Sequence, residues 1–399
     1  MSENRAQKVY RILMLIMITA LITAIITTIV IYQRITGTTD IKQIASNGSN
    51  SGLELTLAKI RTMLEKEYIG TLDDEKMIEG AIKGYVAGVG DEYTEYYSPE
   101  EMSNQLDEAY GNYVGIGIYM LVNNSTGEIL VSKPMPNSPA EEAGIKTGDI
   151  ITKVEGEEVT AENAANMSNK IKGEAGTKVK LEIRRGEETI PLEVERRKIV
   201  VSHINTKVIN ETIGYISIID FDGGVAEEFK SKYEELKKQN IKSLIIDIRS
   251  NGGGVVDEAI GILEMLCNKE DTLLITTDKK GKEEITKSTQ EQEIDLPVVV
   301  LTNGYSASAS EILAGALKDN NRAKIVGTKT YGKGVIQTLT KLSDGSGLKM
   351  TTEEYRTPSR NKINKVGIEP DYKVELPEEI EEVTEQNDTQ LKKAIELLK

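Results

Sequence analysis

A strand, a turn of small residues and a helix follow one another directly in residues 296–317, and this succession sets the class of fold. Leu296–Leu301 is an apolar run rich in β-branched residues, which predicts a buried strand. Ser310–Leu317 carries apolar residues at helical spacing and predicts a helix. A hydroxyl in the turn would face a helix N-terminus, where free N–H groups favour a developing negative charge. The turn offers three serines that are either nucleophile candidates or helix caps: Ser306, Ser308 and Ser310.

A serine nucleophile needs a base, and the sequence offers little choice of one. His203 is the only histidine and has no serine-rich turn near it in sequence, which favours a structural role. Cys267 ends an apolar stretch and is expected to be a packed thiol. A lysine base is therefore the more plausible partner, provided that burial lowers its pKa from about 10.4 to near neutrality.

Charge and composition exclude several classes of function. The net charge of −15 argues against nucleic-acid binding, which needs a basic surface. With one histidine and one cysteine, the chain offers no cluster for a zinc site. We therefore expect no metal site and no cofactor.

The N-terminus predicts a membrane anchor. Ile12–Ile31 is an uncharged run of twenty residues, long enough to cross a core of about 30 Å. Basic residues precede it, which keeps the N-terminus cytoplasmic, and a cleaved signal peptide would have a shorter apolar region. We predict a cytoplasmic stub and anchor in residues 1–35, a polar linker in 36–52, and a single-pass protein of the cell membrane with its later domains outside the cytoplasm.

Two terminal regions carry helical patterns. Residues 53–111 have apolar residues three or four positions apart and form either a packing collar or a dimer surface. Residues 376–399 begin as an acidic linker and end in a short helix, Thr389–Leu398, which either contributes to a dimer or packs on its own domain.

Residues 112–198 carry the marks of a peptide-binding domain. Gly115 and Gly117 leave backbone N–H groups open, as a loop that captures a carboxylate requires. The block Asn137–Ile151 resembles the PDZ domains of bacterial proteases, with later strands at Val154–Val159 and Lys178–Ile183 and a helix at Ala164–Ile171. A small β domain without a ligand is the alternative. The predicted peptide-binding residues are Val114, Gly115, Ile116, Gly117 and Ile118.

Residues 199–375 alternate between strand and helix patterns, which predicts a mixed or parallel sheet covered on both faces. Strands are expected at Ile213–Ile219 and Ser243–Arg249, and a helix at Val225–Lys238. The glycine run Gly252–Gly254 follows the second strand. These glycines either only form a turn or also supply backbone N–H groups for an oxyanion hole.

The anchor, the PDZ block and three motifs occur in an order that resembles the carboxy-terminal processing (tail-specific) peptidases. The motifs are Asp247–Gly254, Ser306–Glu311 and Thr330–Gly334. The resemblance implies a mixed α/β chain: a ClpP/crotonase-like protease core with an inserted α+β PDZ domain, an N-terminal helical region and one transmembrane helix. It also implies a homodimer, and a PDZ domain that captures substrate C-termini and can occlude the active site until peptide binds.

The same resemblance assigns the site residues. Ser308 corresponds to the family's nucleophile, Lys333 to its base and Gln337 to the residue that orients the lysine amine. The oxyanion donors would be the backbone N–H of Ala309 and that of Gly253 or Gly254. Residues four apart in a regular strand are about 13 Å from each other, so Gln337 can reach Lys333 only through a bend or bulge near the flanking glycines.

Two other lysines, Lys172 and Lys329, bear on the predicted peptide site and on the choice of base. The family commonly carries an arginine that couples peptide binding to activation, and this sequence has Lys172 there, which lacks the bidentate fork of arginine. Lys329 is a competing base without flanking glycines. The predicted function is a membrane-anchored serine endopeptidase that cleaves protein tails. The alternative is a non-catalytic, membrane-tethered PDZ scaffold that binds C-termini.

Overall fold

The computed structural model describes residues 50–399, apart from positions 112, 124–125, 162, 200 and 378–383. The chain divides into two compact units at the Gly80–Ala81 junction. Within the described residues, no helix has both the length and the apolar character needed to cross a membrane. The predicted anchor at residues 12–31 lies outside the described residues.

The helical pattern expected in residues 53–111 is present as α3 (Asn50–Glu67), α4 (Asp74–Ala87) and α5 (Pro99–Ala109). α5 begins at Pro99, where a proline fits because the first helical N–H has no partner to lose. Several large apolar side chains of α3 are exposed to solvent: Leu53, Leu55, Leu57, Ile60 and Met63.

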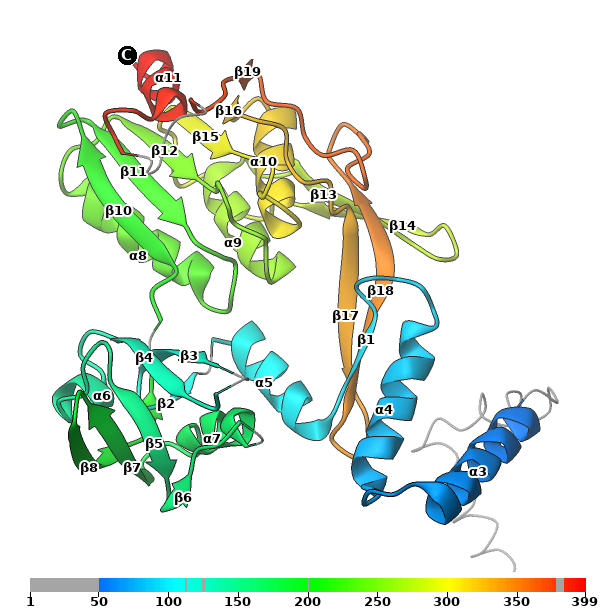
Figure 1. Cartoon of the computed structure of the whole chain (residues 1–399). Helices are drawn as coiled ribbons and strands as arrows, with labels where there is room; N and C mark the ends of the chain where they lie inside the picture. Colours follow the sequence, from blue (N-terminus) through cyan, green and yellow to red (C-terminus); the bar gives the residue numbers. More distant parts are fainter. Residues whose placement is uncertain (1–49, 112, 124–125, 162, 200, 378–383) are drawn as a thin grey trace, which may run out of the picture. The chain divides into compact units, whose positions relative to one another are not determined.

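The core of the second unit is a six-stranded mixed sheet in the order β10-β11-β12-β15-β16-β19 (Figure 1). β10 and β11 pair antiparallel, and the remaining neighbours pair parallel. Every residue of β12 and β15 is buried, because helices cover both faces of a parallel sheet. The strands are β10 (Ile204–Ile209), β11 (Ile213–Ile218), β12 (Ser243–Asp247), β15 (Val298–Thr302), β16 (Ala323–Gly327) and β19 (Tyr372–Lys373).

Two hydrophobic clusters hold helices on the faces of this sheet. The larger cluster joins the sheet to α8 (Val225–Lys237), α9 (Val256–Leu266) and α10 (Ala309–Asp319). The smaller cluster joins it to α11 (Thr389–Leu397), whose Leu391 and Ala394 are buried against the strands. Of the two interpretations of the C-terminal helix, packing on its own domain is the one that the structure shows.

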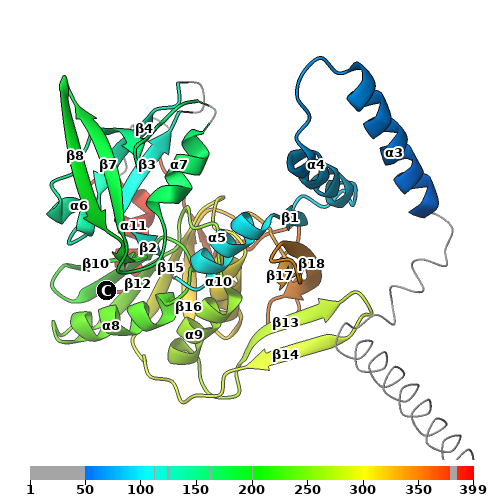
Figure 2. The same cartoon turned by 90° about the horizontal axis from the view of Figure 1, so that it is seen from below.

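A second sheet lies beside the core in the order β1-β18-β13-β14, with β17 paired to β18. Figure 2 shows β13 and β14 as a long hairpin. The sheet matters for the site because β1 comes from the N-terminal region while β17 directly follows Lys333 and Gly334. Its strands are β1 (Glu95–Tyr97), β13 (Thr272–Asp278), β14 (Glu283–Lys287), β17 (Val335–Lys341) and β18 (Gly347–Arg356).

The region between α5 and β10 has its own sheet, in the order β3-β4-β5-β7-β8, and its own hydrophobic core. β3 is an edge strand. β2 (Val114–Gly115) pairs with β9 (Arg197–Lys198), which brings the two ends of the region together. The other elements are β3 (Ile118–Val122), β4 (Ile129–Pro134), α6 (Pro139–Glu142), β5 (Ile150–Val154), β6 (Glu157–Glu158), α7 (Ala164–Ile171), β7 (Lys178–Arg185) and β8 (Glu188–Glu195).

One expected strand of this region differs in the structure. Val154–Val159 is the end of β5, a turn and the two-residue β6. Glu155 and Gly156 both have positive φ, 52° and 83°, a conformation that turns the chain and interrupts a strand.

Candidate active site

Ser308 occupies a strained position in the turn between β15 and α10. It has φ 56° and ψ −117° and is the N-cap of α10. A non-glycine residue in such a conformation costs on the order of 1–3 kcal/mol, which the surrounding contacts must offset. The turn places its side chain where free N–H groups begin the helix.

The other two serines of the motif hold the turn in place. The Ser306 hydroxyl donates to the carbonyl of Ile248 at 2.7 Å, and the Ser310 hydroxyl donates to the carbonyl of Asn251 at 2.9 Å. Both serines are fully buried. The Ser308 hydroxyl, in contrast, makes no hydrogen bond to another segment among the described residues; its oxygen only faces the Glu311 N–H in a capping box. Ser308 is therefore the serine of this motif whose hydroxyl does not hold the turn to another segment.

The glycine run after β12 packs against this turn. A Cβ added to Gly253 would lie 2.7 Å from the Ser308 Cβ, so only glycine permits this approach. The Gly253 N–H is already used, because it donates to the Asn251 side chain at 2.8 Å. Gly254 forms a parallel bridge with Phe221, a pairing that directs its own N–H away from Phe221. Within the described part of the chain, the N–H groups of Gly254 and Ala309 make no hydrogen bond.

A buried carboxylate ties the nucleophile turn to the Lys333 loop. Glu311 is fully buried and accepts the backbone N–H groups of Ser308 at 3.0 Å, Gly332 at 2.7 Å and Lys333 at 2.8 Å. The Thr330 hydroxyl also donates to it. Burial raises the pKa of Glu311, while these four donors favour the ionised form. Sequence reasoning missed this residue, although Ser308 and Glu311 have the Ser-x-x-Glu spacing of a capping box.

A tyrosine hydroxyl also lies between the Ser308 turn and the Lys333 loop, beside one backbone carbonyl of each. Tyr355 of β18 is fully buried, and its hydroxyl lies 3.0 Å from the Ser308 carbonyl and 2.7 Å from the Lys333 carbonyl. The backbones of Ser308 and Lys333 are therefore neighbours, as the family resemblance implies.

The side chain of Lys333 makes no contact with the Ser308 hydroxyl in this structure. Among the described residues, no hydrogen bond joins its amine to the Ser308 hydroxyl; the amine lies 4.4 Å from the centre of the Tyr93 ring. Burial, followed by the nearby charge of Lys349, lowers the pKa of Lys333 below its usual range. A lowered pKa is the property that a lysine base requires.

Lys329 and Gln337 are the remaining candidates from the sequence, and each has a different partner in the structure. Lys329 is half exposed and forms an ion pair with Glu369 at 3.1 Å. Gln337 lies in β17 and donates to the Thr351 hydroxyl at 3.2 Å. The pairing of β17 with β18 shifts register between Ile336 and Gln337, so an irregularity exists, but one residue before Gln337 rather than at the glycines. Within the described residues, Gln337 makes no hydrogen bond to Lys333.

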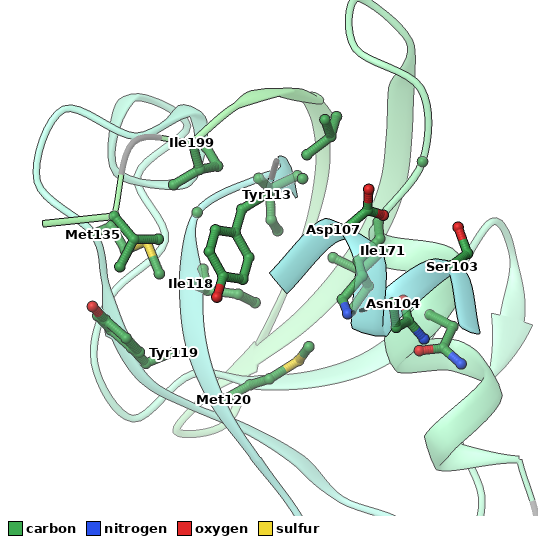
Figure 3. A pocket seen from close by; sticks show the side chains of 18 of the residues that line it. Ser103, Asn104, Asp107, Tyr113, Ile118, Tyr119, Met120, Met135, Ile171 and Ile199 are labelled. Carbon is green, nitrogen blue, oxygen red and sulfur yellow. Dashed lines mark hydrogen bonds between the residues drawn. The ribbon is translucent and has the colours of Figure 1, made fainter. Parts of the chain in front are cut away.

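The predicted peptide-binding residues line one cavity of about 670 Å³. Figure 3 shows Ile118 and Met120 of β3 and Ile171 of α7 around it, together with Asn104 and Asp107 of α5. The α5 wall was not foreseen. Lys172 also lines the cavity, and its amine lies 3.4 Å from the Asn104 side-chain oxygen. The complete set of predicted residues on the cavity is Val114, Gly115, Ile116, Gly117, Ile118 and Lys172.

His203 is buried and forms a polar cluster that also lines this cavity. Its Nδ1 lies 2.7 Å from an Asp220 oxygen, and the Tyr113 hydroxyl donates to Asp222 at 2.8 Å. Among the described residues, His203, Asp220 and Asp222 are the group whose ligand atoms could converge on a metal ion. Cys267 is fully buried, and burial raises the pKa of its thiol to about 12, as expected of a packed thiol.

Two models of known protein families match parts of this chain. Residues 212–374 match the model of peptidase family S41, and residues 130–185 match that of the PDZ domain. The chain is 35% identical over 347 residues to the carboxy-terminal processing protease CtpA of Bacillus subtilis, which covers 86% of this chain and 74% of that relative.

Two further proteins are similar to this chain. A protein of Staphylococcus saprophyticus described as "Probable CtpA-like serine protease" is 34% identical, covering 83% of this chain and 68% of its own length. The solved structure of a photosystem II D1 C-terminal processing protease is 30% identical with a TM-score of 0.47, covering 80% of this chain and 87% of that one.

Proposed function

This chain belongs to peptidase family S41 and is a serine-type C-terminal processing peptidase, and from that premise we propose that Ser308 and Lys333 form its catalytic dyad. The observation that carries the proposal is the pair of bridges, Glu311 and Tyr355, that fix the backbones of Ser308 and Lys333 beside each other. Ser308 is also the motif serine whose hydroxyl does not donate to another segment, unlike Ser306 and Ser310.

The reaction then proceeds through an acyl-enzyme. The neutral Lys333 amine takes the Ser308 proton while the oxygen attacks the scissile carbonyl. Lys333 returns that proton to the leaving amine as the peptide bond breaks. It next accepts a proton from water as the water oxygen attacks the ester. When the bond from the acyl carbon to the Ser308 oxygen breaks, Lys333 passes that proton to the Ser308 oxygen and the acyl group leaves as the carboxylic acid. For these steps the lysine side chain must turn from the Tyr93 ring toward Ser308.

We assign the oxyanion hole to the N–H groups of Ala309 and Gly254. Ala309 begins α10, so its N–H has no partner within the helix. Gly254 is preferred to Gly253 because the Gly253 N–H is held by Asn251. Gln337 retains its proposed role of orienting the amine: its Nε2 donates to Thr351, and its Oε1 is the atom that would accept from Lys333.

The cavity beside β3 is the proposed site for substrate C-termini. β3 is an edge strand, so an extended tail can add to its free edge through backbone hydrogen bonds. The N–H groups of Ile116 and Gly117, between β2 and β3, would hold the terminal carboxylate, and Ile118, Met120 and Ile171 would contact apolar end residues. Lys172 lies close enough to assist, once it leaves Asn104.

Cleavage of a tail peptide tests the dyad. Incubation of the purified chain with a peptide of apolar C-terminus, followed by mass spectrometry, should show internal cleavage. Ser308→Ala and Lys333→Ala should each abolish the products while the melting temperature stays near that of the wild type. Full activity of Lys333→Ala would assign the base to another residue.

We also propose that the peptidase is a membrane-anchored homodimer with its peptidase and PDZ domains outside the cytoplasm. The support for the anchor is the uncharged run Ile12–Ile31 with basic residues before it. The support for the dimer is the exposed apolar face of α3, formed by Leu53, Leu57 and Ile60.

A further inference from the structure

The segment Asp91–Tyr97 lies outside both regions that match known families, yet it forms part of the surroundings of Lys333. Its last three residues are β1, which pairs antiparallel with β18 through Glu95 opposite Lys349 and Tyr97 opposite Gly347. The Thr351 N–H donates to the Thr94 hydroxyl at 3.2 Å. The segment is therefore fixed to the strand that also supplies Tyr355.

Tyr93 is the residue of this segment that meets the lysine. The Lys333 amine lies 4.4 Å from the centre of its ring, within the range of a cation–π contact. The charged groups that act on the amine are Asp91, Glu92 and Glu95 from this segment and Lys349 from β18. Tyr331, from the loop before Lys333, lies against Tyr93.

An aromatic face attracts an ammonium ion, and it offers no comparable attraction to a neutral amine. A general base, in contrast, acts only as the neutral amine and must lie within hydrogen-bond reach of the hydroxyl. The contact with Tyr93 therefore favours the form of Lys333 that cannot take a proton. It also holds the amine over the Tyr93 ring, where the amine makes no hydrogen bond to the Ser308 hydroxyl.

We propose that Tyr93 is a positioning residue that holds the Lys333 ammonium in a resting place, which the base must leave before it can activate Ser308. The inference rests on the dyad proposed above. Because Glu311 and Tyr355 fix the backbone at Lys333, the exchange between the two places needs only rotation of the lysine side chain.

The test is the pH dependence of kcat/KM for a reporter tail peptide, measured on the full chain. Activity should rise with pH as Lys333 loses its proton. Tyr93→Leu removes the ring but keeps an apolar side chain, so it weakens the charged form and should move this rise to lower pH by roughly half to one unit. Below the rise, kcat/KM should then exceed that of the wild type by about three- to tenfold. Tyr93→Phe keeps the ring and should leave the rise where it is.

Tyr97→Leu is a matched control, because the Tyr97 ring lies 5.4 Å from the Lys349 amine rather than from Lys333. It should leave the rise in place. The proposal is overturned if Tyr93→Leu leaves the rise unmoved or moves it to higher pH, or if Tyr93→Phe moves it equally. Loss of the dyad is a separate result: it would appear as full activity of Lys333→Ala.

A second measurement covers the case in which Tyr93→Leu does not fold. Trace labelling of the Lys333 amine with acetic anhydride across pH, read by mass spectrometry, reports its protonation without any need for activity. In Tyr93→Met the labelling midpoint should fall relative to the wild type. An unchanged midpoint would overturn the proposal.

Discussion

Glu311 is the residue that holds the proposed nucleophile and the proposed base together, through the backbones of Ser308 and Lys333. The two carboxylate oxygens of Glu311 accept four hydrogen bonds, so a donor group in place of either oxygen would face another donor. Glu311→Gln introduces an NH₂ group that faces at least one backbone N–H, which costs on the order of 1–3 kcal/mol for the buried group left unpaired. We expect a fall in kcat of about ten- to a hundredfold and a lower melting temperature.

The control for this experiment is Glu369→Gln, which removes an exposed carboxylate that pairs with Lys329. Both quantities should stay near the wild-type values in that variant. A Glu311→Gln enzyme with wild-type kcat would show that the bridge does not position the dyad.

His203 provides a pH dependence of stability that is independent of catalysis. The hydrogen bond to Asp220 raises the pKa of His203 above its usual value of about 6.5. Its contribution to stability is therefore complete below that usual value and is lost as pH rises through the raised one. The difference in melting temperature between the wild type and His203→Gln should shrink as pH rises from about 6 to about 9. A gap that stays constant would contradict this assignment.

At this scale the apolar context of Cys267 predicted a packed thiol, because such context is a local property. The residues alone left three serines open, and the family resemblance supplied Ser308 and Lys333 as the candidates. Tyr93 could not be predicted, since its contact with Lys333 joins segments far apart in the chain. The choice between Gly253 and Gly254 also required coordinates, because it depends on which N–H the Asn251 side chain accepts.

Among the elements, the glycine loop before β3 offers a direct test of the peptide site. Gly117 has φ 74°, and an added Cβ would lie 2.5 Å from the Ser138 Cβ, so alanine would distort the loop. In a Ser308→Ala background, Gly117→Ala should weaken binding of a tail peptide by about tenfold or more, as fluorescence anisotropy would show.

Gly176→Ala is the matched control, because Gly176 has a similar φ of 84° with open space around its would-be Cβ. It carries the same backbone strain and should bind the peptide as the parent does. Equal affinities in the two variants would place the carboxylate elsewhere.

Elements with a strong local pattern were predicted closely. The buried strand, the turn and the helix that carry Ser308 appear as β15 and α10, and the helix expected at Ala164–Ile171 is α7 with the same bounds. The strand that the PDZ resemblance placed at Val154–Val159 was wrong, because the chain turns at Glu155 and Gly156, which have positive φ.

For the molecule as a whole, α3 supplies the test of the proposed dimer. Leu57 and Ile60 lie on one face of α3 and remain exposed. Leu57→Asp together with Ile60→Asp should convert the dimer to a monomer in light-scattering measurements. Leu55→Asp, on another face of the same helix, should leave the mass unchanged. A wild-type chain with the mass of a monomer would remove the dimer from the proposal.

The path of the chain from Tyr93 through β1 into α5 has a practical consequence for redesign. One end of this path meets Lys333, and the other end lines the tail cavity and bonds Lys172. We expect that substitutions in α5 made to accept a new substrate C-terminus also change turnover, because α5 and Tyr93 belong to the same short stretch of chain. A mutant library that varies cavity positions on β3 and α7 alone should retarget the enzyme while its speed is preserved.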